Sequence, residues 1–310
     1  MCYLVTRQHI PIGRVAELLR DAYGAPISTG TIVNMVEEGA LMLSDFLSQV
    51  KDLLRDSQVV HADETGLRVE ALLKWVHATS TTDLTLYHLD NKRGREAMEA
   101  MGVIEHLSGV LVHDGWKPYR KYDNIEHSLC NSHHLRELDA IVETTAQSWA
   151  TEMIELLEST WGLVQNAKEN GRKTLSAEVL STISMKYRAI INAGYLENPS
   201  PEITGRRGQP KKSKALNLLN RLDLYVDDVL RFANDFNVPF SNNLSERDVR
   251  MVKLQQKISG GFRSKDGAEA FLALRSYLST ACKQGINLLD ALQRLYNGNP
   301  WMPTQQGASP

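Results

Sequence analysis

Three acidic residues occur in contexts that suit metal-dependent cutting of a phosphodiester bond. Asp63 and Asp114 lie at the ends of apolar, β-branched runs, V-V-H-A-D-E-T-G and V-L-V-H-D-G-W, which predict strands of a buried sheet. Glu246 lies in the polar stretch N-N-L-S-E-R, which predicts the start of a helix. Carboxylates are hard oxygen ligands, and two Mg²⁺ or Mn²⁺ ions can clamp the attacking and leaving oxygens. The three acids therefore predict a two-metal site.

Each acid also has a simpler interpretation. Side chains alternate along a strand, so Asp63 shares a face with His61 and Thr65, whereas Glu64 points the other way. Asp63 is the better ligand candidate, although an acid at a strand end can simply face solvent. Asp114 could stabilise a turn through its side chain, and Glu246 could serve only the first turn of its helix. The combination of all three favours metal binding.

The elements that must position these acids follow from periodicity. Strands are predicted near 59–68, 74–79, 85–89, 110–113 and 127–130, with a helix over 91–101. Three successive strands followed by alternating helix and strand indicate a mixed sheet with helices on its faces, an α/β fold. A second helix is expected between the last two strands. The glutamate helix is expected within 238–260, and amphipathic helices over 268–282 and 287–296.

The segments outside this sheet are predicted to be helical. Val15, Leu18, Leu19 and Ala22 share one face of a first helix, and Ser28 or Thr29 can cap a second. This outline fits a helix-turn-helix or a hairpin that packs on the main domain. The expected domains are a helical segment (1–56), the first part of the catalytic domain (57–134), a helical insertion (135–237), its completion (238–300) and a flexible tail (301–310).

Composition sets further bounds. The chain has 310 residues, a formal net charge of −2 and three cysteines far apart, so it predicts a cytoplasmic protein without a disulfide framework. The amino terminus lacks the features of a signal peptide, and no apolar run approaches the ~20 residues of a membrane span. The near-neutral charge argues mildly against nucleic-acid binding, but cations are clustered locally.

Five motifs in order resemble the Insertion Sequence 66 family of bacterial DDE transposases. They are H-A-D-E-T-G, H-D-G-W-x-x-Y, L-C-N-S-H-H-L-R-E-L, N-N-x-x-E-R-x-x-R and S-x-x-G-A-x-x-x-x-x-x-x-S. The resemblance implies an RNase H-like catalytic domain with Asp63, Asp114 and Glu246 as the triad. It also implies cleavage at the ends of a mobile element and strand transfer into target DNA. Family members carry an upstream zinc-binding region that this chain lacks, so a truncated copy or a fragment is expected.

Further residues are assigned supporting roles. The resemblance gives Cys130 and His133 a place beside the acids, although a buried cysteine and a histidine at a helix start are an equal alternative. No second Cys/His pair follows at a spacing typical of structural zinc. Asn242 and Asn243 are expected one turn before Glu246. The aromatic pair Trp116 and Tyr119 is expected in the core rather than stacked on DNA.

Local cations are predicted to follow the DNA backbone. The expected contacts are Arg206, Arg207, Lys211, Lys212, Lys214, Arg247, Arg250 and Arg263. The resemblance and the chemistry together predict two Mg²⁺ or Mn²⁺ ions, DNA as partner, a homodimer or larger assembly, accessory proteins of the same element and a place near the nucleoid. The alternatives are an RNase H-like nuclease without strand transfer, or a truncated transposase-derived DNA-binding protein.

Overall fold

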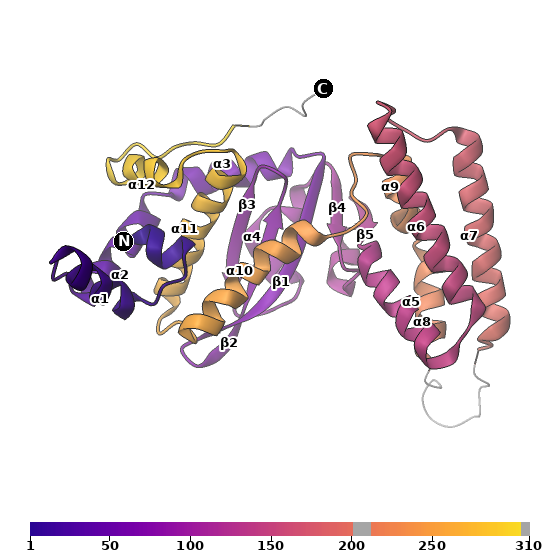
Figure 1. Cartoon of the computed structure of the whole chain (residues 1–310), viewed down its shortest axis with the longest axis horizontal. Helices are drawn as coiled ribbons and strands as arrows, with labels where there is room; N and C mark the ends of the chain where they lie inside the picture. Colours follow the sequence, from indigo (N-terminus) through magenta and orange to yellow (C-terminus); the bar gives the residue numbers. More distant parts are fainter. Residues whose placement is uncertain (201–211, 305–310) are drawn as a thin grey trace. The chain divides into compact units, whose positions relative to one another are not determined.

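The computed structural model describes residues 1–200 and 212–304 (Figure 1). The strands are β1 (Val59–Val69), β2 (Leu72–Ser80), β3 (Thr85–Asp90), β4 (Val110–His113) and β5 (Glu126–Leu129). The α-helices up to the last strand are α1 (Ile12–Tyr23), α2 (Thr29–Leu41), α3 (Ser44–Arg55) and α4 (Arg95–Met101). Those after it are α5 (Asn131–Thr145), α6 (Ser148–Glu169), α7 (Ala177–Glu197), α8 (Lys214–Leu224), α9 (Val226–Asn234), α10 (Asn243–Ser259), α11 (Lys265–Lys283) and α12 (Leu288–Tyr296). A π-helical turn spans Tyr3–Arg7, and 3₁₀ turns span Ile104–His106 and Lys117–Lys121.

The strands form one five-stranded mixed sheet in the order β3-β2-β1-β4-β5. The β1–β2 and β2–β3 pairs are antiparallel, and Asp63 lies directly opposite Ala78. All five strands lie where the hydrophobic patterns predict them, and no strand end differs by more than two residues. The prediction of an α/β fold with a mixed sheet is therefore confirmed.

The chain divides into two compact units by its internal contacts. Unit 1 consists of Met1–Leu111, Trp116–Ile125 and the segment from Asn243 onward, and unit 2 consists of Val112–Gly115 and Glu126–Asn242. The chain therefore leaves and re-enters unit 1 twice. These units are defined by contacts alone, and the domain boundaries expected from the sequence stay a prediction.

In unit 1, alternate side chains of the strands supply two apolar clusters. Val60 and Ala62 of β1 belong to one, together with residues of α2, α3 and α4. Leu67 and Val69 of β1 belong to the other, which also contains Val252 of α10. This switch follows from the two-residue period of a strand, because odd and even positions face opposite sides.

Helix α11 lies along the outer edge of β3 in the same unit. The backbone N–H groups of Thr85 and Tyr87 donate to the hydroxyls of Thr280 and Ser276, at 3.0 Å in both cases. These hydroxyls satisfy two N–H groups on the edge strand β3 that would otherwise face an additional strand.

The amino-terminal helices behave only partly as expected. Ser28 caps α2, since its side chain accepts a hydrogen bond from the Thr31 N–H group at 3.0 Å. Val15 is buried, but Leu18 is 41% exposed, so only part of the apolar face predicted for α1 is buried. The apolar side of α1 is narrower because α1 packs on α2 and the first turn of the chain rather than on the sheet.

Unit 2 is built from five helices and β5 in the part of the chain that is described. Trp149 of α6, Tyr187 of α7 and Leu219 of α8 are fully buried in its core. Gly194 allows α7 to approach α8 closely, because a Cβ atom at this position would lie 2.5 Å from a methyl carbon of Leu219. The long helical stretch predicted after residue 134 is thus present, with its own apolar core.

Other boundaries differ from the sequence predictions. Helix α4 begins at Arg95 rather than at residue 91, whereas α10 begins at Asn243, within the N-N-L-S-E-R stretch that predicts a helix start. The connection between β4 and β5 contains a 3₁₀ turn over Lys117–Lys121 and no α-helix, because it is short and carries Pro118 at its start. Among the described residues, no helix is long and apolar enough to cross a membrane.

Candidate active site

Asp63 lies on the face of β1 that α10 covers. Its partner across the strand pair, Ala78, belongs to the same apolar cluster as Val249 and Val252 of α10. Residues that pair directly across antiparallel strands point to the same side of the sheet. Leu67, an even number of positions further along β1, lies in this cluster as well. The half-buried side chain of Asp63 therefore faces the side of α10.

Contacts along α10 show that the helix runs in the same direction as β1. Lys253 donates from its ammonium group to the Gly66 carbonyl, and Gln256 accepts a hydrogen bond from the Arg68 N–H group at 3.2 Å. Beyond the helix, the Phe262 N–H group donates to the Arg68 carbonyl at 2.8 Å. These contacts fix the register between helix and strand.

This register brings Glu246 level with Asp63. Glu246 precedes Lys253 by seven residues, which is about 10 Å of helix and two turns, so the two side chains share one side of α10. The same length corresponds to about three strand residues, and Asp63 precedes Gly66 by three. Two of the three predicted acids, both half-buried, therefore occupy the same region of unit 1.

Glu64 has a different role from its neighbour. Its side chain is 1% exposed, and Arg93 donates to one of its oxygens from two nitrogens, at 2.6 and 3.0 Å. Tyr119 donates to the other oxygen at 2.6 Å. The Arg93 guanidinium lies over the ring of Trp116, 4.1 Å from its centroid. The separation of the two acids by strand alternation is confirmed, and Tyr119 is a core residue as expected.

Asp114 follows β4 and belongs to unit 2. The next residue, Gly115, has a φ of +90°, which favours glycine. Its N–H group donates to Nδ1 of His113 at 3.0 Å, and Nε2 of His113 is 3.0 Å from Nδ1 of His127. Because Nδ1 of His113 accepts, its Nε2 donates to His127. This buried pair of imidazoles holds the turn that carries Asp114.

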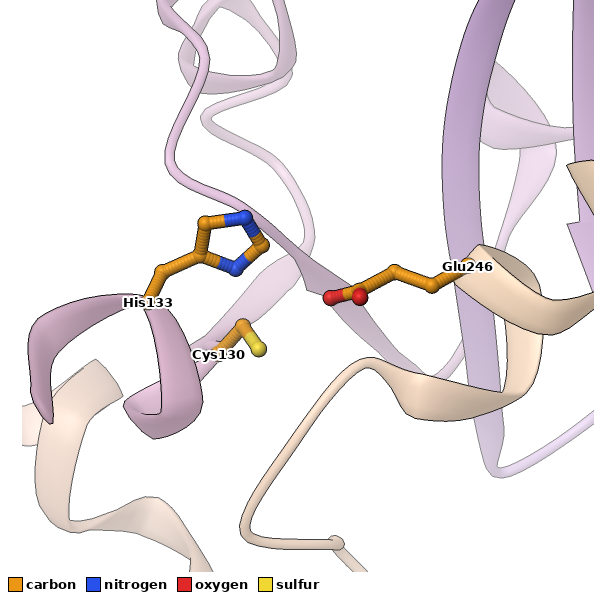
Figure 2. A group of neighbouring side chains, drawn as sticks. All are labelled: Cys130, His133 and Glu246. Carbon is orange, nitrogen blue, oxygen red and sulfur yellow. The ribbon is translucent and has the colours of Figure 1, made fainter. Parts of the chain in front are cut away.

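Cys130 and His133 lie together in unit 2 at the amino end of α5, and Figure 2 shows them with Glu246, which is on the first turn of α10. The Sγ atom of Cys130 and a ring nitrogen of His133 are within 4.8 Å of each other. Cys130 is buried and accepts a hydrogen bond from the Asn242 N–H group at 3.1 Å. The thiol thus holds the residue that directly precedes α10.

Only one of the two asparagines lies on the helix as expected: Asn243 begins α10, one turn before Glu246. Asn242 precedes α10 rather than forming its first turn, and its side chain is fully buried. Asn243 is the first residue of α10 and is exposed. The asparagine pair therefore does not form one polar helix face with Glu246.

The cations expected to bind DNA are exposed wherever they are described. Arg247, Arg250 and Arg263 are exposed in unit 1, and Lys212 and Lys214 are exposed in unit 2. The predicted contacts Arg206, Arg207 and Lys211 lie outside the described residues. Arg250, Lys253 and Lys257 follow Glu246 at spacings of four, three and four residues, so they share its side of α10.

The family assignment rests on sequence comparison. A model of the family described as "Transposase IS66 family" matches residues 1–270. The chain belongs to this family. The IS66 chain is also 22% identical, over 94% of its own length, to "Uncharacterized protein y4jD" of Sinorhizobium fredii. It spans 60% of the length of that relative.

The chemistry of the donor set fits the divalent metal use that the family implies. Asp63 and Glu246 offer carboxylate oxygens, which Mg²⁺ and Mn²⁺ prefer to nitrogen or sulfur. Cys130 offers a soft thiol, and its sulfur already accepts a backbone hydrogen bond. One residue that the motifs passed over, Asp248, lies two positions after Glu246, and its Oδ2 atom accepts hydrogen bonds from Ser80, Thr85 and Lys283. Its position in the family motif is a variable one, so no sequence signal pointed to it.

Proposed function

We propose that this IS66 transposase chain cuts DNA at the ends of a mobile element and joins the freed 3′ ends to target DNA, with Asp63, Asp114 and Glu246 as its catalytic acids on an RNase H-like domain. The observation that carries the proposal is the register of α10 on β1, which brings Asp63 and Glu246 to one level of one face. Two carboxylates so distant in sequence have no need to meet for stability alone.

Asp114 joins the proposal through its place in the chain. The Val110 N–H group donates to the Gln58 carbonyl at 2.8 Å, so β4 begins beside the residue that precedes β1. Asp114 follows Val110 by four residues, and Asp63 follows Gln58 by five. Catalytic groups are commonly carried at the ends of neighbouring strands, where loops open the sheet. This spacing supports the proposal of Asp114 as the third catalytic acid.

Each acid has a specific task in the proposed reaction. Asp63, Asp114 and Glu246 would hold two divalent ions through their carboxylate oxygens. When bound, such ions supply Lewis acidity to the phosphate and lower the pKa of the attacking hydroxyl. The burial of Glu64 against Arg93 keeps that neighbouring carboxylate out of the ligand set. The His113 contact to Gly115 holds the backbone on which Asp114 is mounted.

DNA would approach along the cationic side of α10. Arg250, Lys253 and Lys257 continue from Glu246 along the same side of the helix, and each cation that contacts a phosphate releases counterions. Arg247 and Arg263 would add contacts nearby. Lys212 and Lys214 would add contacts from unit 2, together with the three cations outside the described residues. The helix pair α1 and α2 would either contact DNA bases as a helix-turn-helix or only pack on the rest of unit 1.

The principal experiment measures nicking and strand joining on a DNA fragment that carries the element's terminal repeat, with Mg²⁺ or Mn²⁺. Asp63→Asn, Asp114→Asn and Glu246→Gln keep the side-chain shapes but remove the charge. We expect each to lower the cleavage rate by about a thousandfold, or ~4 kcal/mol in activation free energy. Glu269→Gln is the matched control, because Glu269 is an exposed acid near the start of another helix, α11.

Full cleavage by any of the three triad variants would refute the assignment of that residue. Cleavage without joining of a pre-cut 3′ end would instead identify a nuclease. DNA binding that persists with no cleavage in the unaltered chain would identify a DNA-binding protein only.

A second experiment locates the DNA path by the salt dependence of binding. Log K should fall by about 0.9 per neutralised phosphate for each log unit of salt. Alanine at Arg250 and Lys257 should flatten this slope by about two such contacts if the side of α10 that carries Glu246 lies along DNA. Alanine at the five cations of residues 206–214 tests the other cluster in the same way. An unchanged slope would assign the cluster concerned to solvated surface.

A further inference from the structure

We propose that Asp248 is a positioning residue, which holds the first turn of α10 in the rotation that directs Glu246 towards β1. The inference rests on the proposed function for the role of Glu246. It concerns a residue outside the family motifs, and all of its contacts described below lie within unit 1.

Asp248 accepts several hydrogen bonds from residues at the end of β2 and the start of β3. Its Oδ2 atom accepts hydrogen bonds from the hydroxyls of Ser80 at 2.6 Å and Thr85 at 3.2 Å. Its backbone carbonyl accepts a third from the Tyr87 hydroxyl at 3.0 Å. Ser80 pairs with His61 on β1, two residues before Asp63. The anchor is therefore close to the end of the sheet that carries the catalytic aspartate.

Lys283, the last residue of α11, completes the anchor. Its Nζ atom donates to Oδ2 of Asp248 at 2.9 Å and to the carbonyls of Thr81 and Leu84 at 2.9 and 3.0 Å. An ammonium group has three N–H donors, so all are used. The Lys283 and Asp248 side chains are only 17% and 13% exposed. One lysine thus ties together α10, α11 and the turn between β2 and β3.

The rotation of α10 follows from two contacts on opposite flanks. Successive residues are ~100° apart around a helix, so Asp248 is about 200° from Glu246, and Glu246 is within about 20° of Lys253. Asp248 holds the flank near β2 and β3, whereas Lys253 reaches the Gly66 carbonyl of β1 on the other flank. With both flanks held, the Glu246 side chain is directed to the β1 side.

Apolar packing alone would fix this rotation less strictly. Val249 and Val252 already hold α10 on the sheet, and apolar contacts tolerate small rotations. A buried ion pair adds little net stability over apolar residues of similar size, because both charges lose their hydration. Its directional hydrogen bonds do restrict rotation, and ligand orientation is what a metal site requires. The pairing of Asp248 with Lys283 is accordingly better explained by a role in orienting the Glu246 side chain than by a contribution to stability.

The test compares Asp248→Ala with Asp248→Asn in the full chain, and uses Tyr277→Phe as a control. Asparagine keeps a side-chain oxygen that accepts from Ser80 and Lys283, whereas alanine removes it. Tyr277→Phe removes a buried hydrogen bond of 2.8 Å to the Ala291 carbonyl, also in unit 1 but away from α10. It therefore reports what a comparable loss of stability does by itself.

Two measurements are made on each variant: Mn²⁺ affinity by calorimetry, and amide hydrogen exchange of residues 243–250 without metal. Asp248→Ala should weaken Mn²⁺ binding about tenfold, within the ~10- to 100-fold typical of residues that orient metal ligands, and should speed exchange in the first turns of α10. Asp248→Asn should largely restore both values, and Tyr277→Phe should change neither.

The outcomes separate this inference from the proposed function. If Glu246→Gln abolishes Mn²⁺ binding but Asp248→Ala changes neither affinity nor exchange, the positioning role is refuted and the metal site stands. If Glu246→Gln leaves Mn²⁺ affinity unchanged, the proposed metal site fails. Exchange then decides the anchor by itself: faster exchange in Asp248→Ala supports it, and unchanged exchange overturns it.

Discussion

Replacing Tyr119 with phenylalanine should destabilise unit 1 by about 2 kcal/mol, because it removes a hydrogen bond to a buried charge. The Tyr119 hydroxyl donates to Glu64 at 2.6 Å, and the Glu64 side chain is 1% exposed. Hydrogen bonds to charged groups contribute about 1.5–3 kcal/mol. The ring of Tyr119 remains in phenylalanine, so little of the change comes from lost packing.

Glu64→Gln should cost more, about 3 kcal/mol, which is the lower end of the ~3–5 kcal/mol for breaking a buried ion pair. The lower end applies because the Arg93 side chain is 40% exposed and keeps part of its hydration. By contrast, Asp63→Asn, one residue away, should lower the free energy of unfolding by less than Glu64→Gln does, because asparagine keeps an oxygen that can accept from the Glu64 N–H group, as Oδ1 of Asp63 does at 2.8 Å. Two adjacent acids would then have opposite roles, one in stability and one in catalysis.

The assay is reversible urea unfolding followed by tryptophan fluorescence, since Trp75 and Trp116 both lie against the Arg93 guanidinium. The double variant of Glu64 and Tyr119 completes a thermodynamic cycle. We expect a coupling energy of at least about 1 kcal/mol, beyond the ~0.3–0.5 kcal/mol seen for independent sites. Additive effects would refute the idea that the hydroxyl acts through the carboxylate. An Asp63→Asn variant destabilised as much as Glu64→Gln would refute the separation of roles.

Two further predictions concern each unit in turn. Burial lowers the pKa of His77 from 6.5 to about 4. As the pH falls from about 6.5 towards 4, the unfolded chain therefore binds this proton first, and unit 1 loses stability. His77→Asn should flatten that part of the profile of unfolding free energy against pH, and an unchanged slope would contradict the assignment. In unit 2, Gly194→Ala should cost about 1–3 kcal/mol through overpacking, because the new Cβ would lie 2.5 Å from Leu219 and 3.1 Å from Trp149. Gly162→Ala on α6, with no atom within 4 Å, should be neutral or stabilising in thermal unfolding, and equal effects of the two variants would show that packing at Gly194 is not responsible.

Local patterns in the sequence determined much of the fold and the family. Short runs of apolar and β-branched residues place all five strands. Residue type limits the predicted cap of α2 to Ser28 or Thr29, and the structure shows that Ser28 is the cap. Alternation also separates Asp63 from Glu64. Motif order identifies the family over most of the chain. Each of these signals lies within a few residues, where backbone geometry restricts the possibilities.

Only the tertiary structure decided which face of the sheet α10 covers and how the helix is rotated. Alternation states that Asp63 and Leu67 share a face, but not that Val252, far along the chain, packs on it. The partner of Glu64 is Arg93, and the partners of Asp248 are Ser80 and Lys283, pairs for which sequence spacing carries no information. Such contacts depend on how separate elements fill one core. For that reason the motifs were enough to propose the triad, whereas they gave no indication of the contacts that Asp248 makes.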